Sequence, residues 1–341
     1  MPNPGSTVEG RASCTPARPG DYGGDVPRIK ILIPNSIELH LTADAEVVVY
    51  DIDEAIPDQH RDADMLVLWH NSAERVREAA RNLPRLRVVQ ALASGTDAVL
   101  EAGFAEDVRI CSGRSLHDGP VAEHALALVL SAIRRLDTLR DAQHDHRWDE
   151  EFVAAQGAPE TQGLYTLAGS RVTIWGFGSI ASTLAPQLAL LGAHVEGIAH
   201  TSGPRGGFTV HADADAADVL AETDVLVATL PATSETTGLL DAAVFKALKP
   251  GAVFVNVGRG ATVDEGALID ALRSGRLRAA AIDVTKTEPL PSGDPLWDAP
   301  NLVITPHVAG NRPVGSSRLI DDNLGRLAAG DALLNQVHPQ P

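Results

Sequence analysis

Short apolar runs alternate with helix-like segments along this 341-residue chain, and this alternation limits the fold more than any other feature. The runs at 28–34, 46–51, 64–70 and 85–92 predict strands, 73–84 predicts an amphipathic helix, and the first unit ends near 108–114. Strands separated by helices predict a parallel sheet with crossover helices. Because the chain also exceeds the length of one ordinary domain, we expect an α/β protein with two such units.

A second series of the same kind begins at 170–181. Further strands are expected at 193–200, 223–230, 251–258, 278–284 and 302–307, with helices at 181–191, 241–248 and 264–274. Between the two series, Pro120 suits the first turn of one long helix at about 120–145, and the polar stretch 144–163 predicts a loop. The last helix, at about 315–335, has no strand after it and could return to the first unit.

Composition narrows the function classes. The formal net charge of −17 and the absence of a basic stripe argue against a nucleic-acid partner. Residues 1–27 are rich in Pro, Gly and Ser without an apolar core, which predicts a disordered extension and no signal peptide. No run approaches the roughly 20 apolar residues of a membrane span. Cys14 and Cys111 lack metal-type spacing, so we expect reduced thiols in a cytoplasmic protein without a metal site.

A glycine-rich turn follows the strand at 170–175 and opens a helix, with the sequence Gly176-Phe177-Gly178-Ser179-Ile180-Ala181. The first glycine permits a tight turn, and the second lets the backbone approach a pyrophosphate, whose charge the helix N-terminus favours. The third position needs only a small residue, which Ala181 supplies. This context predicts a dinucleotide site; the alternative is an ordinary tight turn between strand and helix.

The end of the next strand bears on the choice between NAD and NADP. Ala199 stands about where an NAD site carries an acid, roughly 20 residues beyond the glycines. His200, Thr201 and Arg205 follow it. Hydroxyls and an arginine bind a 2′-phosphate, which an acid would repel. We therefore expect NADP in preference to NAD, the alternative being that Arg205 points into solvent.

Three ionisable residues, Arg259, Glu288 and His307, each stand just after an apolar run that breaks into Gly or Pro. The ends of parallel strands converge on one crevice, so these side chains are expected to meet. A guanidinium binds anions, and an imidazole beside a carboxylate serves as an acid or base. Taken singly, each residue has a structural alternative: a loop histidine, a solvated glutamate or a capping arginine.

These residues belong to a set of motifs that resembles a known family. In order, the motifs are VAEHALALVL (121–130), LAGSRVTIWGFGSIA (167–181), LPATSETTGLL (230–240), VNVGRG (255–260), DVTKTEPLP (283–291) and ITPHVAG (304–310). Over roughly 30–335 the chain resembles the D-isomer-specific 2-hydroxyacid dehydrogenases, in particular the glyoxylate/hydroxypyruvate reductases and the phosphoglycerate dehydrogenases. The resemblance implies two Rossmann-like domains: a discontinuous flavodoxin-like substrate domain at 28–118 and 308–341, and an inserted dinucleotide-binding domain at 119–307. It also implies a homodimer.

The resemblance assigns roles to individual residues. Arg259 would orient the substrate, Glu288 would be the carboxylate partner, and His307 would be the proton donor. Ser94 and Gly95 match the loop whose amides hold the substrate carboxylate. Besides the turn residues Gly176 to Ile180 and the trio His200, Thr201 and Arg205, the cofactor-binding positions expected are Leu230, Pro231, Thr236, Val257, Gly258, Arg259, Asp283, His307 and Gly310.

The activity implied is hydride transfer between NAD(P)H and a small 2-oxo acid, giving a D-2-hydroxy acid. Trp148 could reach the substrate pocket of a partner subunit, as in some similar reductases, or pack on the surface. Two alternative functions remain open: a dinucleotide-sensing binding protein that resembles corepressors, and phosphoglycerate dehydrogenase-type activity. Formate oxidation is disfavoured, because that branch carries Gln where this chain has Glu288.

Overall fold

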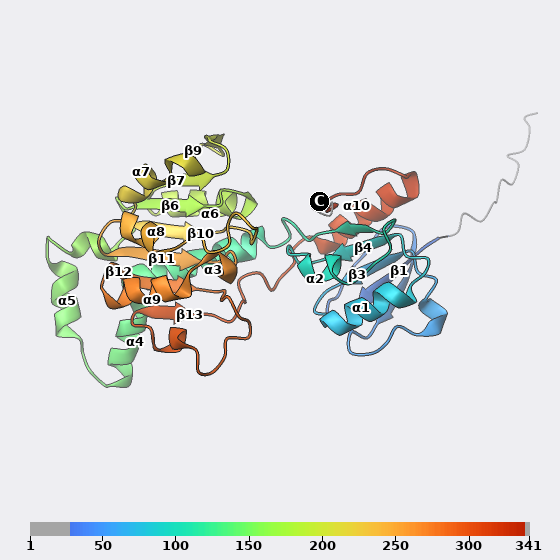
Figure 1. Cartoon of the computed structure of the whole chain (residues 1–341), viewed down its shortest axis with the longest axis horizontal. Helices are drawn as coiled ribbons and strands as arrows, with labels where there is room; N and C mark the ends of the chain where they lie inside the picture. Colours follow the sequence, from blue (N-terminus) through green and yellow to red (C-terminus); the bar gives the residue numbers. More distant parts are fainter. Residues whose placement is uncertain (1–27, 338–341) are drawn as a thin grey trace, which may run out of the picture.

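The computed structural model describes residues 28–337, which form two lobes, each built around its own sheet (Figure 1). The prediction of disorder for 1–27 lies outside the described residues, as do the last four residues of the predicted substrate domain. The connections between the lobes run through 112–118 and 308–315, and they contact each other where Val314 N donates to Leu116 O at 2.8 Å.

The first lobe contains a five-stranded parallel sheet in the order β2-β1-β3-β4-β5. Its strands are β1 (Ile29–Pro34), β2 (Ala45–Tyr50), β3 (Met65–Leu68), β4 (Val88–Ala91) and β5 (Arg109–Cys111). The helices between them are η1 (Asp58–His60), α1 (Ala73–Asn82) and α2 (Asp97–Leu100). This strand order is that of flavodoxin-like folds, so the predicted topology of the lobe is confirmed.

The last helix, α10 (Ser316–Ala329), packs into the first lobe. Its Ile320 and Leu324 share a buried cluster with Ile31 on β1. Two buried amides add specificity, because Asn323 Nδ2 donates to Gln90 Oε1 at 2.8 Å while Asn323 Oδ1 accepts from Leu334 N at 2.8 Å. The chain therefore returns to its first unit. The domain boundaries at 118 and 308 remain a prediction.

The second lobe contains an eight-stranded sheet in the order β13-β12-β11-β10-β6-β7-β9-β8, parallel except at β8. Its strands are β6 (Arg171–Trp175), β7 (His194–Ala199), β8 (Gly203–Arg205), β9 (Phe208–Ala212), β10 (Val225–Ala228), β11 (Ala252–Asn256), β12 (Leu277–Ile282) and β13 (Leu302–Ile304). The helices that follow these strands are α6 (Ser179–Leu190), η3 (Asp213–Asp215), α7 (Ala216–Ala221), α8 (Ala242–Ala247), η4 (Gly260–Thr262), α9 (Glu265–Arg273) and η5 (Pro295–Asp298). The order β9-β7-β6-β10-β11-β12 is that of a Rossmann sheet.

The prediction of one long helix at 120–145 is wrong, because the structure has two helices. α3 (Asp118–Arg134) stops at Arg135, which adopts a left-handed conformation with φ 52°, and α4 (Leu136–His144) follows. The Arg135 guanidinium donates to Asp137, Thr138 and Asn301, which fixes the bend.

The predicted loop at 144–163 is also wrong. It contains α5 (Glu150–Gly157), whose N-cap Asp149 accepts from Phe152 N, and it is followed by η2 (Gln162–Tyr165). Figure 1 shows α4 and α5 at the end of the second lobe that lies away from the first. Trp148, between these two helices, is 84% exposed.

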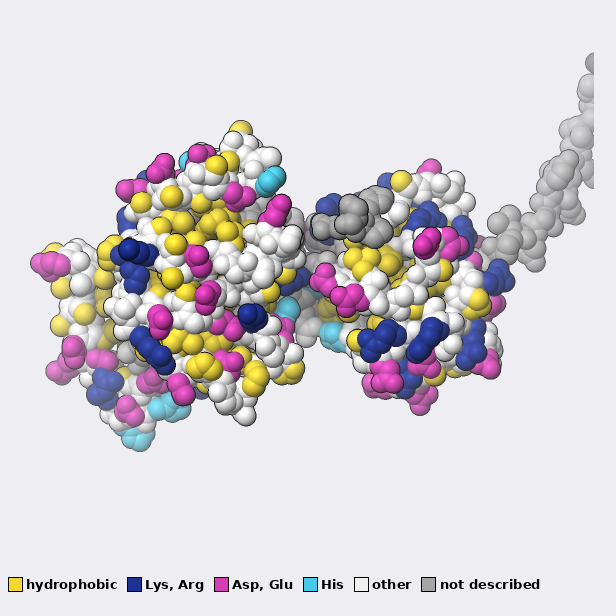
Figure 2. All heavy atoms as spheres, viewed as in Figure 1, with side chains coloured by type: hydrophobic (Ala, Val, Ile, Leu, Met, Phe, Trp, Pro, Cys, Tyr) yellow, Lys and Arg dark blue, Asp and Glu magenta, His cyan; other side chains and the backbone are white. Residues whose placement is uncertain are grey.

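On the face shown in Figure 2, Lys and Arg side chains are scattered among Asp and Glu on both lobes. Within residues 28–337, no helix has both the length and the apolar composition that a membrane crossing needs. The same residues hold no cluster of three or more His, Cys, Asp or Glu side chains suited to a metal ion.

Candidate active site

The three ionisable residues singled out in the sequence follow neighbouring parallel strands. Arg259 comes after β11, Glu288 after β12 and His307 after β13. Because the carboxyl ends of parallel strands lie at one edge of a sheet, the fold gathers these residues there.

The imidazole of His307 and the carboxylate of Glu288 form a close pair, with 2.6 Å between Nδ1 and Oε2. The other oxygen of Glu288 accepts from Thr285 N at 3.0 Å, which orients the carboxylate. Both side chains remain partly open to solvent, at 50% for His307 and 36% for Glu288. Since Nδ1 is taken, Nε2 is the nitrogen left for a ligand, and it makes no hydrogen bond to any residue between 28 and 337.

The backbone of His307 is held by Asp283, which is 1% exposed. His307 N donates to Asp283 O at 2.8 Å, and His307 has φ 53°, an uncommon value for a residue with a side chain. The Asp283 carboxylate accepts from Thr305 Oγ1 at 2.6 Å and from Val308 N and Ala309 N at 3.0 Å. Asp283, expected at the cofactor, thus turns its carboxylate toward the turn that carries His307.

Arg259 is fixed through its backbone. Its carbonyl oxygen accepts from Asn256 Nδ2 at 3.2 Å and from Thr262 Oγ1 at 2.7 Å. The guanidinium donates through Nη1 to Gly258 O at 2.7 Å. Its Nη2 lies close to Gly95 of the first lobe: a Cβ added to Gly95 would be only 3.2 Å from Nη2. The structure therefore brings Arg259 together with the 94–95 loop that follows β4, where Ser94 Oγ donates to Gly113 O at 3.4 Å.

The glycine turn after β6 has the geometry of a phosphate-binding loop. Gly176 has φ 97°, and a Cβ there would lie 2.9 Å from the Thr229 carbonyl carbon, so only glycine fits. Gly178 is the N-cap of α6, whose first amides are free to face an anion. Ser179 Oγ donates to Asp118 Oδ1 at 2.9 Å, and Ile180 packs against the lobe's core.

Phe177, also predicted at the cofactor, has a buried side chain. The ring presses on β7 at Gly197, where an added Cβ would lie 2.2 Å from a ring atom. Only the backbone of Phe177 is therefore available at the loop surface.

Arg205 lies beside the glycine loop. Its Nη1 donates to Phe177 O at 2.8 Å, and its Nη2 donates to Thr201 O at 2.7 Å and to Thr201 Oγ1 at 2.9 Å. The neighbouring His200 is exposed, with Nδ1 3.8 Å from Asp213 Oδ2. A guanidinium and a hydroxyl therefore stand together at the end of β7.

The remaining predicted cofactor positions follow β10, β11 and β13. Leu230 is buried and Pro231 exposed, and Thr236 Oγ1 donates to Pro231 O at 2.5 Å. Val257 is buried, and a Cβ at Gly258 would lie 2.7 Å from Leu230 N and O. Gly310 faces α3, where a Cβ would lie 3.4 Å from the Val121 side chain.

The sequence did not indicate two polar contacts close to this site. His124 on α3 lies 3.0 Å from Thr305 Oγ1 through its Nε2. His70, which follows β3 and stacks on Trp69, lies 2.8 Å from Asn311 Oδ1 through its Nε2. The sequence indicated only their positions: His70 ends the apolar run 64–70, and His124 lies in the helical motif 121–130.

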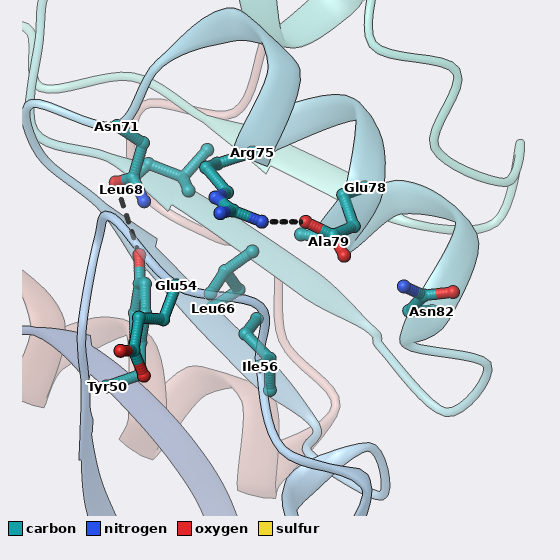
Figure 3. Close-up of a pocket in the computed structure, with 10 residues that line it drawn as sticks. All are labelled: Tyr50, Glu54, Ile56, Leu66, Leu68, Asn71, Arg75, Glu78, Ala79 and Asn82. Carbon is teal, nitrogen blue, oxygen red and sulfur yellow. Dashed lines mark hydrogen bonds and ion pairs between the residues drawn. The ribbon is translucent and has the colours of Figure 1, made fainter.

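A separate cavity in the first lobe, shown in Figure 3, lies between α1 and the ends of β2 and β3. Tyr50 donates to Val67 O at 2.8 Å beside it, with Asn71 Oδ1 3.2 Å away, and burial raises the pKa of the Tyr50 hydroxyl. Arg75 and Glu78 pair at 2.6 Å on the helix above. The cavity volume is about 10 Å³, which suits one water molecule and no substrate.

Comparisons with known proteins identify the family of this chain. Residues 126–309 match the family described as "D-isomer specific 2-hydroxyacid dehydrogenase, NAD binding domain". The chain is 33% identical over 283 residues to glyoxylate/hydroxypyruvate reductase A of Serratia proteamaculans, which covers 80% of this chain and 86% of that protein. It is 32% identical over 237 residues to D-3-phosphoglycerate dehydrogenase of Mycobacterium leprae, which covers 69% of this chain and only 43% of that protein.

A solved structure is also similar along nearly the whole chain. It is a D-isomer specific 2-hydroxyacid dehydrogenase from Xanthobacter autotrophicus Py2 in complex with NADPH and MES, with a TM-score of 0.74 and 28% identity. The similarity covers 92% of this chain and 98% of that one. The two sheets, with the glycine turn after β6, are those of a two-domain α/β protein with a dinucleotide-binding domain. The chain belongs to the D-isomer specific 2-hydroxyacid dehydrogenase family.

Proposed function

We propose that this protein is an NAD(P)H-dependent reductase of small 2-oxo acids that forms D-2-hydroxy acids. The observation that carries the proposal is the 2.6 Å pair of His307 and Glu288 on the sheet edge that also bears Arg259. An imidazole with one nitrogen bound to a carboxylate and the other free is equipped to pass a proton to a carbonyl oxygen.

A bound nicotinamide dinucleotide supplies the hydride in this chemistry. The chain's own residues do the rest. Arg259 carries a fixed positive charge that can bind the substrate carboxylate through two parallel hydrogen bonds, a geometry that lysine lacks. His307 gives the proton from Nε2 to the carbonyl oxygen, and Glu288 stabilises the charged imidazolium before transfer. In the reverse direction neutral His307 accepts the proton.

We propose NADP as the preferred cofactor, with NAD as the alternative. The glycine loop leaves room for a pyrophosphate at Gly178, where an added Cβ would have only Gly176 O within 4 Å, at 3.9 Å. Arg205 and Thr201 at the end of β7 offer a cation and a hydroxyl to a 2′-phosphate, and Ala199 adds no repelling charge. The similar protein from Xanthobacter autotrophicus was solved with NADPH, which supports the same preference.

For the substrate we propose glyoxylate or hydroxypyruvate, as the name of the Serratia relative suggests. Phosphoglycerate dehydrogenase-type activity is the second candidate, favoured by the Mycobacterium leprae relative, although this chain spans less than half of that protein's length. We also propose a cytoplasmic homodimer, whose mass in solution would be twice that of the chain. Exposed apolar side chains on the α4–α5 segment (Leu136, Trp148 and Val153) support the dimer. Buried Cys111, which forms no disulfide within residues 28–337, suits a reducing compartment.

A panel assay tests the proposal. Loss of nicotinamide absorbance is followed with NADPH and with NADH against glyoxylate, hydroxypyruvate, pyruvate and phosphohydroxypyruvate. We expect the highest kcat/KM with NADPH and glyoxylate or hydroxypyruvate. Tight NADPH binding without turnover of any 2-oxo acid would instead support a dinucleotide-sensing protein. A clear preference for phosphohydroxypyruvate would support the second candidate.

A further inference from the structure

A second imidazole, that of His124 on α3, contacts the turn that carries His307. His124 Nε2 lies 3.0 Å from Thr305 Oγ1 and 3.4 Å from Asp283 Oδ1, and the His124 side chain is 22% exposed. Nothing in the proposed chemistry uses this residue, yet it contacts the Thr305 hydroxyl and the Asp283 carboxylate, and that carboxylate binds the two amides that follow His307.

The protons of this cluster have one consistent arrangement. The Asp283 carboxylate is an acceptor when ionised, and Thr305 has a single hydroxyl proton, which points to Asp283 Oδ1 at 2.6 Å. The oxygen of Thr305 is then left to accept a hydrogen bond from His124 Nε2–H at 3.0 Å. A directed chain of hydrogen bonds therefore runs from His124 through Thr305 to Asp283, and each bond polarises the next.

His124 is also the basic side chain nearest to a buried carboxylate. Within residues 28–337, His124 is the one His, Lys or Arg side chain next to the Asp283 carboxylate, with Nε2 3.4 Å from Oδ1. A carboxylate that is 1% exposed is costly unless neighbouring polar groups compensate its lost hydration. Thr305, the 308–309 amides and His124 together provide that compensation.

What Asp283 holds is the backbone of His307. Its carbonyl accepts the His307 N–H at 2.8 Å, and its carboxylate accepts the next two N–H groups. Glu288 fixes the ring of His307, whereas Asp283 fixes its uncommon backbone conformation. We propose that His124 is a positioning residue for His307 and acts on it through Thr305 and Asp283; this inference rests on the proposed function.

The test uses three variants of the full chain. His124→Phe removes the donor and keeps an aromatic ring, Thr305→Val removes only the bridging hydroxyl, and His124→Gln keeps a side-chain N–H. A misplaced proton donor can slow turnover strongly without weakening binding. We therefore expect kcat to fall about 10- to 100-fold in the first two variants, with both KM values nearly unchanged. His124→Gln should retain most of the wild-type kcat, because it keeps a donor. His40→Gln is the matched control, because the His40 side chain is 85% exposed.

A spectroscopic readout on the protein without cofactor or substrate accompanies the kinetics. The ring C–H signal of His307, assigned by its loss in His307→Gln, should shift in His124→Phe and Thr305→Val and stay in place in His40→Gln. Unchanged kcat together with an unmoved signal in both variants would overturn the positioning role. Absent turnover by the wild-type protein would refute the proposed function alone, because the His307 signal still decides the inference. Should His124→Phe not fold, Thr305→Val and His124→Gln decide it.

Discussion

At the residue scale, His307 and Glu288 are the part of the site that the sequence predicted best. Each follows an apolar run, and two adjacent parallel strands place their ends at the same edge, which accounts for the 2.6 Å contact. The contact of His124 with Thr305 could not be predicted in this way. The two residues are 181 positions apart, and the sequence of α3 indicated only which of its residues are apolar.

If His307 and Glu288 act as one unit, their substitutions are not additive. His307→Gln should lower kcat about 100-fold or more, the usual contribution of general acid catalysis. Glu288→Gln should cost less, since the imidazole remains. The double variant should be no slower than His307→Gln alone, because Glu288 acts through His307. A double variant whose loss equals the product of the two single losses would show that Glu288 acts separately.

At the scale of elements, the alternation of strands and helices predicted both sheets, whereas the segment between the lobes was predicted wrongly. The break after α3 depends on Arg135, held in a left-handed conformation by Asn301, which is 166 residues away. No local Gly or Pro marks that break. α5 has little amphipathic periodicity, and its best signal was the N-cap Asp149. The strands β8 and β9 were both missed, because they span only three and five residues and neither forms a clear apolar run.

α10 is fastened to the first lobe by a carboxylate whose titration can be followed. Asp321 accepts hydrogen bonds from Thr42 N, Thr42 Oγ1 and Ala43 N. Burial alone would raise the pKa of Asp321, but the hydrogen bonds from Thr42 and Ala43 outweigh it and hold the pKa below its usual value. Because the pKa is lower in the folded state, the stabilisation is full above the unfolded pKa of about 3.9 and is lost as the pH falls through the folded value.

Asp321→Asn should therefore lower the free energy of unfolding by about 1–2 kcal/mol near neutral pH, and by progressively less below about pH 4. Urea unfolding of both proteins across this range measures the difference. Asp322→Asn is the matched control. The Asp322 side chain is exposed, and its ion pair with Arg318 at 3.9 Å is weak, so the substitution should cost under about 0.5 kcal/mol. A loss from Asp321→Asn that does not change with pH would contradict the role of its charge.

At the scale of the whole molecule, the site depends on a contact between lobes. Arg259 comes from the second lobe and Gly95 from the first, and the guanidinium fills the space next to the glycine. Gly95→Ala places a methyl group 3.2 Å from Arg259 Nη2, so the guanidinium must move by a few tenths of an ångström. We expect the KM for the 2-oxo acid to rise about 3- to 10-fold while the KM for NADPH stays the same, since the bidentate geometry of Arg259 is disturbed.

The control for that substitution is Gly325→Ala on α10, where an added Cβ meets open space. It should leave both KM values unchanged. If Gly95→Ala raised the KM for NADPH as much as the KM for the 2-oxo acid, a specific contact with the 2-oxo acid would be contradicted. The sequence predicted Arg259 from its place after an apolar run, but Gly95 only through the family resemblance. Their contact could not be predicted, because contacts between lobes leave no periodic pattern in the sequence.

The most direct test of the proposed function is chiral analysis of the product that the wild-type protein forms from hydroxypyruvate and NADPH. We expect D-glycerate in molar equivalence with the NADPH consumed. Formation of L-glycerate, or no glycerate with either NADPH or NADH, would contradict the proposed function.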